Sequence, residues 1–203
     1  GRGGRSITLD ADLPGHDRPH VFTPEDVLQG GARPSGRVLV IDGEGYHAAT
    51  GLAEMLAGQG AEVGLVFATH SPVSPRLTDN WEERYVVRRL KQAGVRLMPA
   101  TWIASIGEHA VVLRDVHTGE EREEPCDAVV LATGREPVDG LTRALAGQVR
   151  QLYTIGDALA VRPFAVAAYE GQKFARMIGE PGAPATIAQA YFAPDPPEVG
   201  FMP

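Results

Sequence analysis

Two short segments in the last third of the 203-residue chain carry the residue types of a nucleotide site. Residues 129–135 and 152–158 are apolar, strand-like runs that lead into Gly134 and Gly156. In open α/β sheets, ligands bind beyond the carboxyl ends of the strands. Asp157 follows Gly156 directly, so the backbone could approach a ligand closely while the carboxylate accepts hydrogen bonds from sugar hydroxyls. The sequence therefore predicts a nucleotide contact near its C-terminal end.

A degenerate dinucleotide-binding fingerprint follows the apolar run at 37–41. That fingerprint places glycines at fixed positions after the first strand. Counted one residue beyond the run, Gly43 and Gly45 occupy two of these positions, but Asp42 and Glu44 lie in the same loop. At an effective dielectric constant near 20, a carboxylate about 4 Å from a phosphate charge costs about 4 kcal/mol. This exceeds what the dipole of the following helix returns, so the loop disfavours a pyrophosphate.

The next apolar run also lacks the residues that select a nicotinamide cofactor. Residues 67–69 contain neither the acid that binds an NAD ribose nor an arginine for the 2′-phosphate of NADP. We interpret the loop as a structural relic of the fold and regard NAD(P) binding as doubtful. Measurable binding of NAD(H) or NADP(H) at micromolar concentration would contradict this interpretation.

Composition excludes several classes of site and partner. A formal net charge of −7 argues against nucleic acid or an anionic membrane as a partner. The single cysteine, Cys126, excludes an internal disulfide and a Cys-clustered metal site. The six histidines show no metal-ligand spacing, and no hydrolase, Walker or zinc-protease motif is present. With no apolar run near the ~20 residues of a membrane span and no signal-peptide core, the prediction is a cytoplasmic protein without metal or catalytic residues of its own.

The periodicity predicts an α/β fold of Rossmann type. A capped helix is expected at 23–28, and strands and helices then alternate at 37–41, 48–59, 62–67, 81–93 and 95–98. This alternation favours a parallel sheet with right-handed crossovers. Three further strands at 101–106, 110–115 and 127–132 are predicted to form an antiparallel meander, and the acidic stretch at 120–124 a solvated loop. A last helix is expected at 163–178.

This order of elements resembles the second half of the two-dinucleotide flavoprotein reductases. It is most similar to the C-terminal region of the trimethylamine dehydrogenase/2,4-dienoyl-CoA reductase family, whose N-terminal part is a flavin-binding barrel of the old yellow enzyme type. The degenerate loop resembles the amine-dehydrogenase branch of that family more than the reductase branch. The resemblance covers nearly the whole chain and is carried by residues 22–27, 42–46, 52–54, 132–135, 155–158, Arg162-Pro163 and Glu170-Gly171.

The resemblance implies a two-dinucleotide-binding flavoprotein fold whose FAD-like half is incomplete. Residues 36–135 would form an NAD(P)-binding-like domain, 1–35 and 136–180 a remnant of the FAD/ADP-binding-like domain, and 181–203 an extended tail. The barrel, the FMN site, the iron–sulfur cysteines and the first adenine-binding loop would lie outside this sequence. The chain is thus expected to be a fragment or a split subunit.

The same resemblance assigns roles to individual residues. Gly156 and Asp157 would lie against the sugar or ribityl part of FAD or a bound ADP, and Arg162 near a phosphate or a domain interface. Thr133 and Gly134 are further candidate contacts. Each has a simpler alternative: Asp157 as a helix cap, Thr133 and Gly134 as a strand-end turn, and Arg162 as a solvated side chain.

The leading functional hypothesis is a nucleotide-binding-like module of an FMN-dependent oxidoreductase, inert alone. The parent would oxidise a C–N bond, as an amine dehydrogenase or N-demethylase, or reduce a conjugated C=C bond, with FMN and a 4Fe-4S cluster in the parent or partner. The flavin-barrel portion would be the partner, in a homo- or hetero-oligomer, and FAD or ADP would need the missing half. The alternatives are a noncatalytic binding or assembly subunit and, disfavoured by the damaged fingerprint, an independent NAD(P)-dependent reductase.

Overall fold

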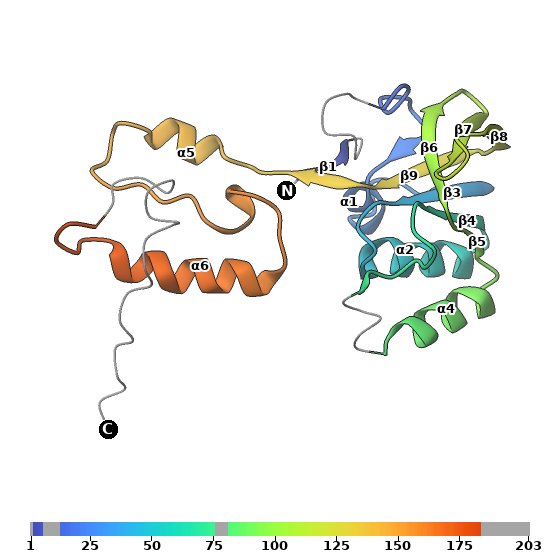
Figure 1. Cartoon of the computed structure of the whole chain (residues 1–203). Helices are drawn as coiled ribbons and strands as arrows, with labels where there is room; N and C mark the ends of the chain where they lie inside the picture. The colour runs from blue at the N-terminus through green and yellow to red at the C-terminus, as the bar shows by residue number, and fades with distance from the viewer. Residues whose placement is uncertain (1, 6–12, 76–80, 184–203) are drawn as a thin grey trace. The chain divides into compact units, whose positions relative to one another are not determined.

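A computed structural model describes residues 2–5, 13–75 and 81–183 (Figure 1). The chain divides into two compact units, one of residues 3–134 and one of residues 1–2 with 135–203. Most of the predicted tail at 181–203 lies outside the described residues. The division falls beside the predicted boundary at 135, but it groups residues 13–35 with 36–134, so their assignment to an FAD-like remnant stays a prediction.

A five-stranded parallel sheet organises the first unit. Its order is β2-β9-β3-β4-β5, with bounds β2 Val21–Phe22, β3 Arg37–Asp42, β4 Glu62–Phe67, β5 Arg96–Met98 and β9 Ala128–Ala132. Asp42 at the end of β3 is in register with Phe67 on β4 and with Ala132 on β9. These strands therefore end at one edge of the sheet, where an α/β fold places its ligands. The predicted Rossmann-like fold is confirmed.

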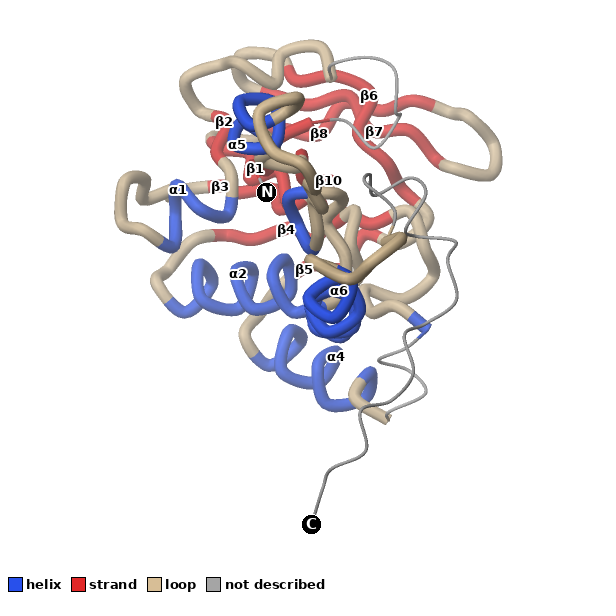
Figure 2. The backbone as a smooth tube through the Cα atoms, turned by 90° about the vertical axis from the view of Figure 1, so that its left-hand side faces the viewer, coloured by secondary structure: helices blue, strands red, loops and turns tan. Residues whose placement is uncertain are grey.

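Two different layers cover the faces of this sheet. One cluster packs Val38 and Val40 of β3 against helix α2, and the other packs Leu39 and Ile41 against the antiparallel strands. The helices are α1 (Pro24–Leu28), α2 (His47–Gly58) and α4 (Glu83–Gln92), and the antiparallel strands are β6 (Thr101–Ile106), β7 (Ala110–Asp115) and β8 (Glu121–Pro125). Figure 2 shows α2 and α4 running along the same side of the strands. Because alternate side chains of β3 face opposite layers, its inner residues 38–41 are all apolar, as in buried parallel sheets.

The meander differs from the prediction in its third strand. The run at 127–132 does not join the meander but forms β9, which lies between β2 and β3 in the parallel sheet and is buried at every position. The third meander strand is β8, in the acidic stretch predicted as a loop. Two arginines compensate these negative charges: Arg114 on the adjacent strand β7 pairs with Glu121 at 2.6 Å, and Arg96 on β5 of the parallel sheet pairs with Glu124 at 2.5 Å. Cross-strand ion pairs of this kind make an acidic sequence compatible with a strand.

Helix α1 begins with the predicted cap. The N–H of Asp26 donates to the Thr23 hydroxyl (3.2 Å), and the N–H of Thr23 donates to the Asp26 carboxylate (2.8 Å). Pro24 occupies the first helical position, where no N–H is needed. Two backbone donors that would otherwise lack a partner are thereby satisfied.

We expect Thr23→Ala to lower the free energy of unfolding by about 1 kcal/mol, because the first donor loses its acceptor. Urea denaturation of the two proteins measures this loss. Thr23→Ser keeps the hydroxyl and serves as the matched control. Equal losses in the two variants would show that the cap does not stabilise α1.

The second unit is built around its last helix. It contains β10 (Gly134–Glu136, whose first residue belongs to the other unit), α5 (Gly140–Leu145), a 3-10 turn (Gly156–Ala158) and α6 (Phe164–Met177). Strand β1 (Arg2–Arg5) begins in this unit, and its other residues belong to the first unit. The predicted final helix is confirmed, and its buried residues Phe174 and Met177 pack with Tyr153 and Ile155.

The strand expected before Gly156 is not formed. Among residues 152–155, only Leu152 makes an isolated bridge. A strand needs a neighbouring strand to satisfy its backbone groups, and the described part of this unit supplies no further pairing there. The apolar pattern is used instead to place Tyr153 and Ile155 against α6.

Candidate functional site

The loop between β3 and α2 lies at the carboxyl edge of the parallel sheet, where a dinucleotide fold binds its pyrophosphate. The N–H groups of its first three residues, 43–45, are all used within the protein. Gly43 donates to the carbonyl of Ala132 (3.0 Å), and Glu44 and Gly45 donate to Oδ1 of Asp42 (2.9 and 2.8 Å). The carboxylate of Asp42 thus accepts the loop donors that a phosphate would otherwise take. The Asp42 side chain, at the end of β3, thereby closes this loop to an external anion.

Asp42 is buried, with 4% of its surface exposed. Its second oxygen, Oδ2, is also buried and has no hydrogen-bond partner among the described residues. Burial raises the pKa of this carboxyl from 3.8 to about 6, against the lowering effect of the N–H bonds to Oδ1, and the nearby charge of Glu44 raises the pKa further. Desolvation outweighs hydrogen bonding here because it penalises the charged form of the whole group.

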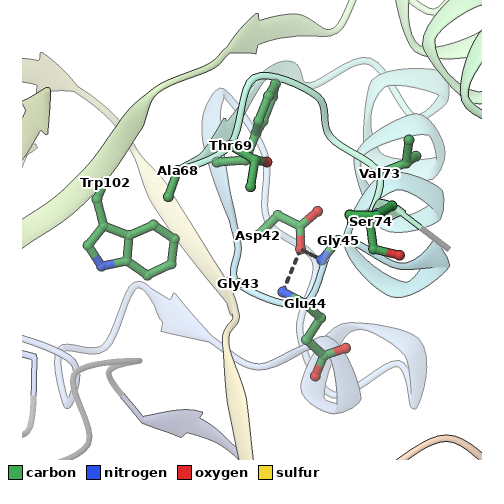
Figure 3. A pocket seen from close by; sticks show the side chains of 11 residues that line it. Asp42, Gly43, Glu44, Gly45, Ala68, Thr69, Val73, Ser74 and Trp102 are labelled. Atoms are coloured by element: carbon green, nitrogen blue, oxygen red, sulfur yellow. Dashed lines mark hydrogen bonds between the residues drawn. The ribbon is translucent and has the colours of Figure 1, made fainter. Parts of the chain in front are cut away.

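A pocket of about 470 Å³ lies beside this loop (Figure 3). Its walls come from the loop, from the end of β4 and the segment after it, and from β6; they are residues 42–45, 67–69, 73–75 and Trp102. The polar side chains on this wall are those of Asp42, Glu44, Thr69 and Ser74, and none of the described lining residues is Lys, Arg or His. The two carboxylates on the described wall oppose a phosphate ligand.

The segment after β4 also closes over the loop. The N–H of Ser74 donates to the carbonyl of Gly45 at 2.7 Å. Gly45 has φ +66°, and a Cβ atom there would lie 3.1 Å from the Ser74 nitrogen. The glycine is therefore required by the close approach of the protein's own backbone, in addition to the positive φ. Thr69, near the position where an NAD site carries its acid, donates its hydroxyl hydrogen bond to the carbonyl of Ser71.

Four of the seven predicted site residues lie in the first unit. Gly43 and Gly45 lie in the loop, and Thr133 follows β9, the strand next to β3. Thr133 is buried, whereas Gly134 is exposed and begins β10. The structure thus places Gly43 and Thr133 at one sheet edge. Their cofactor contacts stay predictions.

The other three predicted residues lie in the second unit, around a buried carboxylate. Both oxygens of Glu170 accept hydrogen bonds: Oε2 from the N–H of Gly156 (2.7 Å) and Oε1 from the guanidinium of Arg162 (2.6 Å). The Glu170 side chain is 1% exposed and that of Arg162 27%. Asp157, by contrast, is exposed. Glu170 therefore joins the turn at Gly156 to helix α6.

Sequence reasoning did not find this structural role of Glu170. One signal was available, because Glu170, Phe174 and Met177 have the four- and three-residue spacing of one helix face. An acid on an apolar face requires a partner, and Arg162, eight residues earlier, is a nearby cation. The spacing could therefore have suggested the pair.

The described segments show no metal site and no transmembrane helix. No three His, Cys, Asp or Glu side chains gather there in an arrangement that could hold a metal ion. None of the helices in these segments combines the length and apolar character needed to cross a bilayer.

The parallel sheet and the glycine loop define an α/β fold of the dinucleotide-binding class. Residues 2–169 match the model of the pyridine nucleotide-disulphide oxidoreductase family, and the chain belongs to this family. Within it, the chain is homologous to members of the trimethylamine dehydrogenase family, and it corresponds to their C-terminal FAD/NAD-like region. The resemblance seen in the sequence is confirmed.

Three relatives illustrate this homology. Dimethylamine dehydrogenase of Hyphomicrobium sp. (strain x) is 29% identical over 82% of this chain. Among solved structures, 6-hydroxypseudooxynicotine amine oxidase from Pseudomonas geniculata N1 has a TM-score of 0.80 and 36% identity over 88% of the chain. Histamine dehydrogenase from Rhizobium sp. 4-9 has a TM-score of 0.80 and 27% identity over 89%. The chain spans only 26%, 27% and 29% of these three proteins.

Proposed function

We propose that this chain is the C-terminal nucleotide-binding-like module of an FMN-dependent oxidoreductase of the amine-dehydrogenase type. The observation that carries the proposal is the closed loop after β3, in which Gly43, Glu44 and Gly45 direct their N–H groups to acceptors of the protein itself. A module whose pyrophosphate donors are occupied has no means of binding a nicotinamide dinucleotide in the usual way. The homology to amine dehydrogenases supports the type of parent enzyme.

In this proposal the module is catalytically inert alone. The redox chemistry belongs to an FMN and an iron–sulfur cluster held by the barrel portion, as the family resemblance implies. The parent would oxidise an amine C–N bond. This module would contribute the interface to the barrel portion and to other subunits.

Asp157 and Gly156 would form one wall of a site for FAD or ADP. The exposed carboxylate of Asp157 fits contact with sugar hydroxyls. Gly156 has φ +59°, and a Cβ atom there would lie 3.4 Å from Ala167, so the turn already lies close to α6. Arg162 is held by Glu170 and would add positive charge beside that wall.

Spectroscopy and titration of the purified chain test this proposal. We expect the chain alone to show no flavin absorption band, no turnover of NADH or NADPH, and no binding of either at micromolar concentration. Mixed with the barrel portion of the same enzyme, it should form a stable complex that shows the flavin spectrum. Stoichiometric flavin on the chain alone, together with NADPH turnover, would overturn the proposal. A stable complex whose barrel portion also lacks flavin would instead indicate an assembly subunit.

A further inference from the structure

Helix α4 carries a row of positive charge along its exposed side. Arg84, Arg88 and Lys91 follow one another at intervals of four and three residues, which places them on one face of the helix. All three side chains are exposed. On the inner side of the helix, by contrast, Arg89 is neutralised by Glu54 of α2. Like charges four residues apart destabilise a helix, so the stability of α4 does not explain the exposed row.

Two exposed aromatic side chains accompany this row. Tyr85 is 45% exposed and Trp81 76%. The guanidinium carbons of Arg84 and Arg88 lie 4.6 and 5.6 Å from the centre of the Tyr85 ring. This stacking holds the two arginines in place beforehand, so less side-chain freedom is lost when a partner binds. Tryptophan, tyrosine and arginine are also the residues that dominate the energetics of protein interfaces. We call the two arginines, Lys91 and the two aromatic residues the basic face.

Nearby acids leave the basic face positive. Glu82 is turned toward α2, where its carboxylate lies 3.2 Å from Nε2 of His47. Glu83 is on the inner side of the helix, seven residues before the buried Leu90. The segment at 76–80 contains one arginine and one aspartate and adds no net charge. On a chain with a net charge of −7, the basic face is a local reversal of sign that attracts an acidic surface.

The hairpin of β7 and β8, in the same unit, carries such an acidic surface. Glu120 and Glu123 are exposed, and neither forms an ion pair among the described residues. Arg122 faces the opposite side of the strand from Glu123, because successive residues of a strand alternate. Val116, in the turn that joins the two strands, adds an exposed apolar side chain. We call Glu120, Glu123 and Val116 the acidic edge, since β8 is an edge strand of its sheet.

The basic face and the acidic edge flank the same edge strand of the parallel sheet. Helix α4 leads directly into β5, and β8 reaches β5 through the ion pair of Arg96 and Glu124. In Figure 1, β8 and α4 lie on opposite sides of β5. A two-fold axis that runs along β5 in the plane of the sheet exchanges these two sides. It would therefore bring α4 of each copy to β8 of the other, and a contact of this kind closes with two copies.

We propose that two copies of this chain form a dimer in which the basic face of each copy docks on the acidic edge of the other. The two exposed arginines of α4 pair with the two unpaired glutamates of the hairpin, and Tyr85 packs against Val116. Each contact is made twice, once on each side of the axis. The edge of β5 in each copy is covered by the other copy, so an exposed sheet edge is protected as well.

Sedimentation equilibrium of the full 203-residue chain at several concentrations tests the dimer. We expect a monomer–dimer equilibrium, with no larger species, because the contact is closed. Raising the salt concentration from about 0.1 M to about 1 M shortens the screening length from about 10 Å to about 3 Å. The dissociation constant should therefore rise at least tenfold.

A charge exchange between the two surfaces identifies the contact. The double variant Arg84→Glu with Arg88→Glu and the double variant Glu120→Arg with Glu123→Arg should each be monomeric alone, because like charges then meet. Mixed in equal amounts, they should form a dimer, since the acidic α4 of the first meets the basic hairpin of the second and the other contact is unchanged. This recovery also shows that both variants are folded.

A matched control separates the surfaces from the effect of net charge. Arg33→Glu with Arg150→Glu makes the same change of charge at two exposed arginines outside both surfaces and should leave the dimer intact. A chain that stays monomeric at every concentration, as it would if the basic face serves a different partner, would overturn the proposal. So would association that does not respond to salt, equal effects of the control and the α4 variant, or a mixture that fails to dimerise. The contact involves neither flavin nor the barrel portion, so these results are distinguishable from failure of the proposed function.

Discussion

Asp42→Asn should remove a stability loss of about 3 kcal/mol that the parent chain suffers between pH 4 and pH 8. The carboxyl of Asp42 has a pKa of about 6 in the folded chain, above its ordinary value of 3.8. The folded state therefore binds this proton more tightly than the unfolded state, and the stability it contributes is present below pH 3.8 and lost as the pH rises through 6. Each pKa unit corresponds to about 1.4 kcal/mol, which gives the magnitude of about 3 kcal/mol.

Urea unfolding at several pH values measures this difference. The amide of asparagine does not titrate. The free energy of unfolding of the variant, relative to that of the parent, should therefore rise by about 3 kcal/mol from pH 4 to pH 8. A constant cost of placing an amide at this position cancels from that comparison. Asp115→Asn is the control with the opposite sign, because two backbone N–H groups lower the pKa of Asp115. A pH-independent difference for Asp42→Asn would show that Asp42 is solvated in the folded chain.

The parallel sheet was predictable because burial on both faces leaves a strong pattern. Strands β3 and β4 are buried by a helix on one face and by the meander on the other, so their inner positions are apolar or glycine. The Thr23 cap was equally clear, since its two hydrogen bonds are local in sequence. Features that depend on local contacts or on complete burial are therefore the easiest to predict from a single sequence.

The pairing of β8 and β9 was not predictable from the same pattern. A strand pattern shows that a segment is extended but not which strand lies beside it. Strand β9 pairs with β2 and β3, which lie far from it in the sequence. The acidic composition of β8 hid its strand character because the arginines that pair with it come from β5 and β7. Both errors arise from contacts between distant segments.

The candidate site shows the same limit. The sequence indicated that Asp42 and Glu44 disfavour a pyrophosphate, but the expected cause was repulsion between their carboxylates and the phosphate. In the structure, the Asp42 carboxylate instead occupies the loop donors themselves. That rearrangement depends on a side-chain orientation that residue type and spacing do not determine.

Glu170→Ala should destabilise the second unit by about 3 kcal/mol, the loss typical of a buried ion pair that loses one partner. The Glu170 side chain is 1% exposed and receives both the N–H of Gly156 and the guanidinium of Arg162. Its removal deprives the partly buried Gly156 N–H and the Arg162 guanidinium of the acceptor that Glu170 provides. Hydrogen exchange of the Gly156 amide measures the effect locally, and a loss of this size corresponds to roughly a hundredfold drop in protection. Glu180→Ala, at an exposed acid in the same unit, is the control, and equal protection in the two variants would contradict the role assigned to Glu170.

A paired replacement separates the structural role of Arg162 from a role toward a phosphate. Buried ion pairs are often replaced by apolar residues without loss of stability, so Arg162→Met together with Glu170→Met should recover most of the protection that Glu170→Ala loses. If Arg162 acts only by holding Glu170, the double variant should keep any affinity for ADP that the complex with the barrel portion has. If Arg162 also contacts a phosphate, the double variant should fold normally yet bind ADP more weakly. The buried pair would then be the means by which this unit holds a cation ready beside Asp157.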